Sequence, residues 1–355
     1  MRIIHILTDT NIGGAGRYLL ALLESYNRDN FQMEVVLPVG SQLAPSIAAL
    51  DVPVLEALHI SDKSLSVKGV GVLYQILKER KPDLVNTHAS FSGRVAAKLL
   101  GKKVIYTRHY CVSKGKFSFI NNLFSDGVIA TSPEVEAGLI SIGTKPNHIT
   151  TIFNGVPPVK VLSTEEKSAL RMQYGISPNT FVVSQIARLD PIKGHDHTLD
   201  AAKLLAKEDP DILILLAGEG PSRDHISGRI KSESIKNVLM VGFVSEVEKI
   251  INITDLQINA SYTETTCLAL LEGMSLGIPA VVTNGGGNPY VISHGEQGFV
   301  FPCGDSSALA EAIIKIRGDL ALRQQMSQKA LETYNKNFRA DNMARQLETL
   351  YKTFL

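Results

Sequence analysis

The sequence predicts an α/β protein built of two doubly wound domains. With 355 residues the chain is longer than one hydrophobic core usually serves, because cores stop growing near roughly 250–300 residues. Apolar runs of strand length alternate with longer segments of helical period, which is the pattern of parallel sheets covered by helices. Near the middle, Phe153–Pro158 (FNGVPP) can continue neither a strand nor a helix. We therefore expect one domain over 1–156 and a second over 157–338.

The predicted strands follow one another in both halves. In the first half they are Arg2–Thr8, Gln32–Leu37, Leu84–His88, Lys103–Arg108 and Gly127–Thr131. In the second half they are Phe181–Ala187, Ile212–Ala217, Val238–Gly242, Leu256–Ala260, Ala280–Thr283 and Gly298–Phe301. Ligands of such sheets bind outside the carboxyl ends of the strands. Functional residues are therefore expected just after these strands.

The last segment, 339–355, has a different pattern. Its apolar residues fall on one stripe at helical spacing, which predicts an amphipathic helix. They are Met343, Leu347, Leu350, Tyr351 and Phe354. The stripe must pack on something, and the N-terminal domain is one candidate.

Composition excludes several classes of protein. Apolar residues make up 44% and charged residues 20%, which is a globular balance. A net charge of +1 argues against a nucleic-acid partner. No export signal follows Met1, and no apolar run reaches the ~20 residues of a membrane span. The cysteines Cys111, Cys267 and Cys303 are far apart and predict neither a disulfide framework nor a zinc site. A cytoplasmic protein is expected.

One stretch of the first half is strongly basic. Seven basic residues and no acidic one lie between Arg94 and Lys116, and the apolar run Phe117–Ile120 follows. Basic side chains beside exposed apolar ones suit an anionic membrane surface. A solvated basic face, with the phenylalanines in the core, explains the pattern equally well. The sequence leaves both interpretations open.

The first predicted strand leads into a glycine-rich turn, Gly13–Gly16, with a helical run from Arg17. Glycines at a helix start let a phosphate approach main-chain N–H groups at the positive end of the helix dipole. Gly14 and Gly16 are therefore candidate ligand-binding residues. The turn is not the dinucleotide fingerprint, because Leu19 stands where its last glycine would be. A plain strand-to-helix turn is the alternative.

Two cations follow the first strand of the second half. Arg188 stands at the carboxyl end of that strand, and Lys193 is expected at the start of the next helix. Both can converge above the sheet, where they would neutralise a diphosphate through charge-assisted hydrogen bonds. The alternative is a pair of solvated surface charges.

The most informative segment is 264–279. A helix is predicted from Thr265 or Thr266 to Gly277, because threonine can cap a helix and glycine before Pro279 ends it. Glu264 would then stand before the helix and Glu272 about two turns inside it, so the two carboxylates would address different parts of one extended ligand. The N–H groups at the helix start would face its phosphates; these belong to Thr266, Cys267 and Leu268. A solvated Glu264 and an incidental Glu272 are the alternative.

Taken together, these features resemble the GT-B glycosyltransferases of family four. The motifs are Arg188…Lys193, the spacing of Glu264 and Glu272, the Gly277–Pro279 step, the Gly285–Gly287 loop and the first glycine-rich turn. The resemblance implies two Rossmann-like domains facing a central cleft, with the final helix crossing back to the N-terminal domain. By resemblance Arg188 and Lys193 hold the diphosphate, Glu264 contacts the donor sugar and Glu272 binds the ribose.

The resemblance also extends to the acceptor side. His109, after the strand ending at Arg108, corresponds to a histidine that faces the donor sugar in this family. His109 is therefore the candidate for the catalytic region. His88 also ends a strand, so His88 and Arg108 are candidates for the acceptor side; a packed or solvated histidine is the alternative for His88. Two motifs depart from the family pattern: Thr265–Cys267 has side chains at positions that are often glycine, and Tyr290 replaces a carboxylate. These departures concern sugar and nucleobase preference and leave main-chain contacts to the diphosphate unchanged.

The expected activity follows from this resemblance. It is transfer of a hexose-type sugar, with retention, from a nucleotide-diphosphate donor to a glycan or lipid-linked acceptor in cell-surface polysaccharide or glycolipid assembly. No cofactor and no metal are expected; Asp209–Asp211 reads as a helix-ending turn and His195–His197 as a solvated helix start. A sugar-nucleotide epimerase of the same fold and a non-catalytic nucleotide-sugar binding module are the alternatives. A lipid-linked acceptor would bring the chain to the inner face of the cell membrane.

Overall fold

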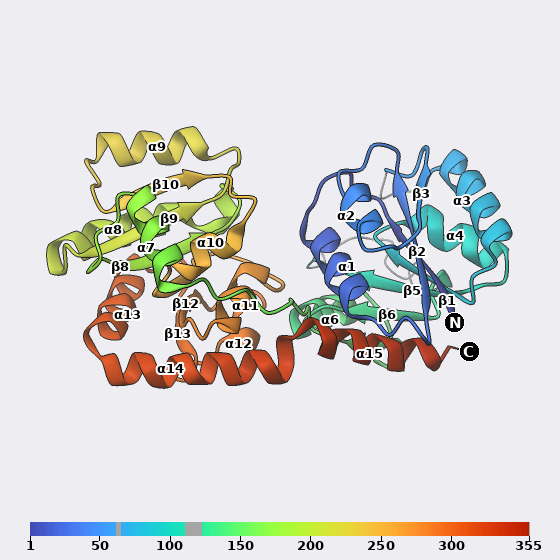
Figure 1. Cartoon of the computed structure of the whole chain (residues 1–355). Helices are drawn as coiled ribbons and strands as arrows, with labels where there is room; N and C mark the ends of the chain where they lie inside the picture. Colours follow the sequence, from blue (N-terminus) through green and yellow to red (C-terminus); the bar gives the residue numbers. More distant parts are fainter. Residues whose placement is uncertain (62–64, 111–122, 355) are drawn as a thin grey trace. The chain divides into compact units, whose positions relative to one another are not determined.

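The structure, a computed structural model, describes residues 1–61, 65–110 and 123–354. The chain divides into two compact units (Figure 1). Unit 1 comprises Met1–Pro157 and Phe338–Leu355, and unit 2 comprises Pro158–Asn337. Each unit has its own parallel sheet covered by helices on both faces. The predicted α/β class with two doubly wound sheets is therefore confirmed.

The sheet of unit 1 has the strand order β3-β2-β1-β4-β5-β6-β7, and its strand pairs are parallel. Its strands are β1 (Arg2–Leu7), β2 (Gln32–Pro38), β3 (Val54–Ala57), β4 (Leu84–His88), β5 (Lys103–Arg108), β6 (Gly127–Ala130) and β7 (Ile149–Thr151). The sequence did not predict β3 and β7. Both are short edge strands, with four and three residues, so their apolar runs are too brief to stand out.

Helices cover the two faces of this sheet. They are α1 (Gly14–Ser25), α2 (Ala44–Ala48), α3 (Val67–Arg80), α4 (Phe91–Leu99), α6 (Pro133–Ser141), the 3₁₀ turn Pro146–His148 and α15 (Ala340–Lys352). Successive residues of β1 point to opposite faces: Ile3 and Leu7 join the core under α1 and α15, whereas Ile4 and Ile6 join the core under α3 and α4. Side chains at odd positions of β1 therefore face α1 and α15.

The final helix, α15, packs on unit 1, as predicted from its apolar stripe. Arg339 precedes it, and Met343, Leu347 and Tyr351 are buried in the same core as α1. The Tyr351 hydroxyl accepts a hydrogen bond from Asn86 Nδ2 of β4 at 2.8 Å. The helix is thus held by a buried polar contact as well as by its apolar face.

The sheet of unit 2 has the order β10-β9-β8-β11-β12-β13. All six strands lie where the sequence predicted them, within one residue. They are β8 (Phe181–Ile186), β9 (Ile212–Ala217), β10 (Val238–Gly242), β11 (Leu256–Asn259), β12 (Ala280–Thr283) and β13 (Gly298–Phe301). Central strands of a parallel sheet are apolar on both faces, which makes them easy to recognise.

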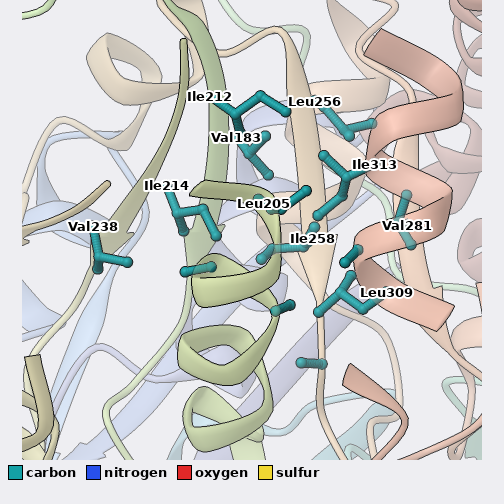
Figure 2. Packing of buried hydrophobic residues seen from close by; sticks show 14 of the residues in the cluster. Val183, Leu205, Ile212, Ile214, Val238, Leu256, Ile258, Val281, Leu309 and Ile313 are labelled. Carbon is teal, nitrogen blue, oxygen red and sulfur yellow. The ribbon is translucent and has the colours of Figure 1, made fainter. Parts of the chain in front are cut away.

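The helices of unit 2 also lie on both faces of its sheet. They are α7 (Thr164–Gln173), the 3₁₀ turn Pro191–Lys193, α8 (His195–Glu208), α9 (Arg223–Ser232), α10 (Val247–Asn252), α11 (Leu268–Ser275), α12 (Asn288–Val291), α13 (Ser306–Gly318), α14 (Leu320–Thr333) and the π-helical turn Tyr334–Phe338, which passes into unit 1. Figure 2 shows the larger core, in which Leu205 of α8 and Ile313 of α13 pack on Val183 and Ile258. Each such side chain contributes about 1.5–3 kcal/mol by leaving water.

The basic stretch from Arg94 is less exposed than its sequence suggests. Arg94 is buried, with its guanidinium over the rings of Phe91 and Tyr106, and burial lowers its pKa to about 10. Lys98 and Lys103 both pair with Asp126, a carboxylate supplied from outside the stretch. The expectation of one continuous basic face is therefore wrong for these three residues. Lys114, Lys116, Phe117–Ile120 and Cys111 lie outside the described residues. Among the helices that the structure describes, none is long and apolar enough to cross a membrane.

Candidate active site

In unit 2, the strand order reverses at β8. Its neighbours are β9, which follows it, and β11, which comes much later in the chain. A ligand of an open parallel sheet binds at such a switch point, outside the carboxyl ends of the strands. The segments that leave β8 and β11 there are 187–194 and 260–267, which contain the basic residues and the first glutamate of the predicted site.

Lys193 and Glu264 form an ion pair at this switch point. Lys193 Nζ lies 2.5 Å from Glu264 Oε2, and the two side chains are 22% and 14% exposed. Burial alone would lower the pKa of Lys193, but the attraction of Glu264 outweighs it, so the pKa is raised. Gln185 donates to the Lys193 carbonyl and fixes the backbone that carries the lysine. The pair therefore presents a held cation beside a held carboxylate.

Arg188 takes part in a separate ion pair. Its guanidinium lies 3.4 Å from Asp190 and is 68% exposed. In the described structure the two cations thus pair with different carboxylates, whereas the sequence predicted that they converge. Lys193 was predicted at the start of the next helix, but it precedes that helix. It ends the 3₁₀ turn, and α8 begins at His195, after Gly194 in the left-handed conformation (φ 67°).

The segment His195–His197 is not simply a solvated helix start. His195 is buried against the Arg188 carbonyl, and burial lowers its pKa, so this histidine is part of the packing beneath Arg188. His197 bonds to the Tyr262 hydroxyl. Asp209–Asp211 is the helix-ending turn that the sequence predicted: Asp209 follows α8 and accepts from the Asp211 N–H.

Helix α11 begins later than predicted. Its first residue is Leu268, and Cys267 before it has an extended backbone, so Thr266 and Cys267 precede the helix. The reason is that the backbone of the preceding residues is bonded elsewhere: the Glu264 carbonyl accepts from the Gly287 N–H at 2.6 Å. Burial and the nearby Glu264 raise the pKa of Cys267 to about 11, so its thiol stays protonated.

Glu272 is the fifth residue of α11, about one turn inside it, whereas two turns were predicted. It is buried. Gly273, which follows Glu272, allows α11 to lie close to the sheet, because a Cβ at this position would lie only 2.0 Å from Gln257 Oε1 of β11. Helix α11 ends at Ser275, and Gly277 adopts φ 71°, which is the predicted glycine stop.

The backbone of the loop Gly285–Gly287 packs directly against the backbone of Glu264 and Thr265. A Cβ on Gly286 would lie 2.3 Å from the Glu264 carbonyl oxygen, and one on Gly287 would lie 2.0 Å from the Thr265 carbonyl oxygen. Gly286 also adopts φ 58°, which favours glycine. Backbone contact this close is why these positions carry glycine, and it fixes the position of Glu264.

In unit 1, the strand order reverses at β1, which lies between β2 and β4. The glycine turn follows β1, but α1 begins at Gly14, three residues before the predicted start. A Cβ on Gly16 would lie 3.3 Å from the Leu43 side chain, so packing explains this glycine. A Cβ on Gly14 would have no heavy atom of the described residues within 4 Å. Packing therefore does not explain the glycine at position 14. Of the two glycines, Gly14 is the stronger candidate for a position where a ligand approaches the main chain.

Three histidines form a hydrogen-bonded row at the carboxyl ends of β1, β4 and β5. His5 Nδ1 lies 3.1 Å from His88 Nε2, and His88 Nδ1 lies 2.8 Å from His109 Nε2. The ring of Tyr18 packs edge-on against His109. His88 is buried and hydrogen-bonds to His109, so the structure favours a packed histidine over one that itself lines the acceptor side. The guanidinium of Arg108 donates to the Tyr106 hydroxyl and the Tyr110 carbonyl.

Sequence reasoning missed His5 and Tyr18. A signal for His5 was available, because it is the one polar residue in the otherwise apolar run Ile3–Leu7 and takes the same alternation as Ile3 and Leu7. It therefore had to be buried with a partner.

Acid is expected to destabilise unit 1 through these histidines. Burial lowers the pKa of His5 to about 3 and lowers that of His88 well below its ordinary value. In the unfolded chain both titrate near about 6.5. Below that pH the unfolded state binds more protons, so stability is full above about pH 6.5 and falls as the pH drops toward 3. Each histidine contributes a slope of about 1.4 kcal/mol per pH unit.

Urea unfolding of the native protein and of His5→Phe at pH 7 and pH 5 measures this slope. Between pH 7 and pH 5, the free energy of unfolding of the variant should fall by about 2 kcal/mol less than that of the native protein. His59→Gln, which alters an exposed histidine of the same unit, should keep the native slope. Equal slopes in the native protein and His5→Phe would contradict the assignment.

Among the residues that the structure describes, no three His, Cys, Asp or Glu side chains gather into a group that could hold a metal ion.

Two doubly wound parallel sheets, with charged groups at the switch point of the second sheet and histidines at that of the first, define a class of protein. It is an α/β enzyme of the GT-B type. Two family models match the chain, "Glycosyl transferases group 1" over residues 166–333 and "Glycosyltransferase Family 4" over residues 12–160. The chain belongs to the group 1, family 4 glycosyltransferases, and the resemblance predicted from the sequence is confirmed.

Individual relatives cover most of the chain. N-acetyl-alpha-D-glucosaminyl L-malate synthase of Bacillus anthracis is 28% identical over 78% of this chain and 76% of its own length. UDP-Gal:alpha-D-GlcNAc-diphosphoundecaprenol alpha-1,3-galactosyltransferase of Escherichia coli is 25% identical over 91% and 89%. The crystal structure of HepE from Anabaena in complex with UDP superposes with a TM-score of 0.87 over 99% of this chain and 100% of that one, at 23% identity. That likeness shows the fold.

Proposed function

We propose that the chain transfers a hexose-type sugar, with retention of anomeric configuration, from a nucleoside-diphosphate donor to a glycan or lipid-linked acceptor in cell-surface polysaccharide or glycolipid assembly. The observation that carries the proposal is the Lys193–Glu264 pair at the switch point of unit 2. A cation and a carboxylate held side by side suit a ligand with a diphosphate next to sugar hydroxyls. The diphosphate needs positive charge, and the sugar hydroxyls need hydrogen-bond acceptors.

The positive charge would act as the diphosphate departs. When the bond between the sugar's anomeric carbon and the phosphate oxygen breaks, its electron pair leaves with the diphosphate. In this proposal Lys193, Arg188 and the N–H groups at the start of α11 would stabilise that developing negative charge, and no metal ion would be required for the step. In front-face attack the acceptor oxygen bonds to the same side of the carbon, and its proton passes to the departing phosphate oxygen. We assign no carboxylate nucleophile.

The donor and acceptor classes are supported by the relatives. HepE has been crystallised in complex with UDP and with UDP-glucose, and the Escherichia coli relative is named for a UDP-sugar donor and a diphosphoundecaprenol acceptor. UDP-sugars are therefore the donors to screen first. An acceptor of this kind would bring the chain to the inner face of the cell membrane; sedimentation with anionic vesicles at low and high salt checks that contact.

Calorimetry with two ligands on two matched variants tests the donor site. Glu272→Gln should weaken the binding of UDP and of the UDP-sugar by about the same factor, because the Glu272 carboxylate is assigned to the ribose, which both ligands carry. Glu264→Gln should leave UDP binding within about threefold and lower turnover of the UDP-sugar by about 100-fold, since only the complete donor carries the sugar. Equal losses for both ligands in both variants would refute these roles.

A transfer assay decides the activity itself. Radiolabelled UDP-sugar and a lipid-linked or soluble glycan acceptor should yield a glycoside with the donor's anomeric configuration, which NMR of the product reports. A product of inverted configuration would remove retention from the proposal. Conversion of the donor to its epimer, or binding without any transfer, would support the two alternatives, neither of which the family favours.

A further inference from the structure

From the charges at the carboxyl end of β5 we infer that Arg108 binds a phosphate or diphosphate group of the acceptor, with Arg94 as a second positive charge nearby. The protein then selects acceptors that carry such a group beside the accepting sugar. This inference deepens the proposed function and rests on it in placing the acceptor at unit 1.

The Arg108 side chain is held in a fixed orientation at the end of β5. Its Nη1 donates to the Tyr106 hydroxyl at 2.8 Å, and its Nε donates to the Tyr110 carbonyl at 3.0 Å. The guanidinium also stacks on Tyr110, with Cζ 3.8 Å from the ring centroid. Thr131 Oγ1 donates to the Arg108 carbonyl at 3.0 Å, which fixes the backbone as well. A guanidinium held in this way loses little freedom when it binds a ligand.

The charge of Arg108 is not neutralised within the described structure. Both of its hydrogen-bond acceptors are neutral oxygens, and no carboxylate of residues 1–61, 65–110 or 123–354 lies within ion-pair distance. A guanidinium has five N–H donors, and these bonds use only part of them. Arg108 is half-buried, so its other donors can serve a ligand that approaches from solvent.

A second guanidinium lies close to the first. Arg94 is only 4% exposed, and its Cζ lies 4.3 Å from the centroid of the Tyr106 ring, whose hydroxyl accepts from Arg108. Burial is the main reason that the pKa of Arg94 falls to about 10, and the charge of Arg108 lowers it further. Two like charges around one buried ring repel each other, and an anion bound at Arg108 would offset that repulsion.

The number of positive charges favours a phosphate over a carboxylate. A carboxylate carries a single negative charge, whereas a phosphate monoester carries about −1.5 to −2 at pH 7. A diphosphate that links a lipid to a sugar is likewise a dianion. A planar guanidinium also binds phosphate oxygens through two parallel N–H groups. The diphosphate of a lipid-linked acceptor and the phosphate of a soluble glycan share this chemistry.

Nitrogen NMR of the native protein, labelled with ¹⁵N-arginine, tests the site at pH 7.5 with saturating UDP, which keeps phosphate out of the donor site. Inorganic phosphate should shift the Nε–H signal of Arg108 in a saturable way, and the loss of this signal in Arg108→Lys assigns it. Acetate should need at least about tenfold higher concentration for the same shift. An Arg108 signal that phosphate leaves unchanged, or that acetate shifts as readily, would overturn the inference.

Two variants at opposite ends of β5 separate a local site from general charge. In calorimetry with inorganic phosphate and saturating UDP, Arg108→Gln should weaken binding at least about tenfold, the factor that one charge-assisted hydrogen bond contributes. Lys103→Gln removes the same charge from the first residue of the strand, where Lys103 lies 3.8 Å from Asp126, and should leave the phosphate Kd within about twofold of native. Equal losses in both variants would refute a site at Arg108.

Two further comparisons identify the source of the phosphate. Geranyl diphosphate should bind more tightly than inorganic pyrophosphate if the acceptor is lipid-linked, and equally tightly if it is a soluble glycan phosphate. In the transfer assay, a sugar linked to geranyl diphosphate should have a kcat/KM at least about tenfold above that of the uncharged geranyl glycoside of the same sugar. Arg108→Gln should remove that preference. Equal use of both acceptors by the native protein would refute the selectivity.

Failure of the inference and failure of the proposed function remain distinguishable. Absence of sugar transfer by the native protein refutes the proposed function, while the Arg108 signal still reports whether this residue binds phosphate.

Discussion

Lys193→Ala is expected to lower kcat/KM for sugar transfer by about 100-fold to 1000-fold, the range found when one preorganised donor to a developing negative charge is removed. Lys193 is held by the Gln185 contact to its backbone and by its pair with Glu264, so its charge needs no reorganisation as the diphosphate leaves. Its loss deprives the Glu264 carboxylate of a charged donor, and the free energy of unfolding should fall by about 2 kcal/mol. Steady-state kinetics and urea unfolding measure the two effects.

Lys203→Ala is the matched control. Lys203 also pairs with carboxylates of unit 2, Asp200 and Glu233, but these pairs lie on the surface of α8 and α9. Its removal should leave transfer within about twofold of native. Native turnover in Lys193→Ala, or an equal loss in both variants, would remove Lys193 from the proposed site.

Gly286→Ala should lower transfer by about 100-fold, although residue 286 is not assigned any contact with substrate. The new Cβ would lie 2.3 Å from the Glu264 carbonyl oxygen and 2.5 Å from its nitrogen, so the Glu264 backbone must move. A displacement of about 1 Å in a catalytic group is enough for a loss of this size. The positive φ adds strain, and the unfolding free energy should fall by about 2–4 kcal/mol.

Gly295→Ala separates displacement from strain. Gly295 also has a positive φ, 86°, and lies in the same unit, but a Cβ there would have no heavy atom of the described chain within 4 Å. It should lower the unfolding free energy by about 1 kcal/mol and leave transfer unchanged. If Gly286→Ala keeps native transfer, the loop does not position Glu264.

The sequence predicted the sheets better than the site. Central strands such as Ile212–Ala217 are apolar runs bounded by turns, and their limits follow from one-dimensional pattern alone. The start of α11 does not, because Thr265 and Thr266 are plausible caps by composition. What moves the start to Leu268 is a contact from loop 285–287, about twenty residues downstream. Such long-range backbone contacts leave no periodic signal.

The charged residues illustrate the same limit. Arg188 and Lys193 were correctly placed after β8, but their partners, Asp190 and Glu264, could not be ranked from spacing. Lys98 and Lys103 were expected on a free basic face, and Asp126 neutralises them from a later part of the chain. The row from His5 to His109 depends on strand order, which places β1 beside β4 and β4 beside β5. A sequence specifies the members of such a row only once the topology is known.

Unit 1 is built from two segments, Met1–Pro157 and Phe338–Leu355, and all of unit 2 is made between them during biosynthesis. Chains emerge from the ribosome from the N-terminus, and domains usually fold in that order. Here unit 2 can complete its core first, because Met343, Leu347 and Tyr351 of unit 1 are made after all of unit 2. Until they arrive, the apolar surfaces of α1 and β1 that they cover stay open to water. Residues 1–157 thus depend on protection by chaperones until unit 2 has been made, and a premature stop codon within codons 338–355 would damage unit 1 although it lies after unit 2.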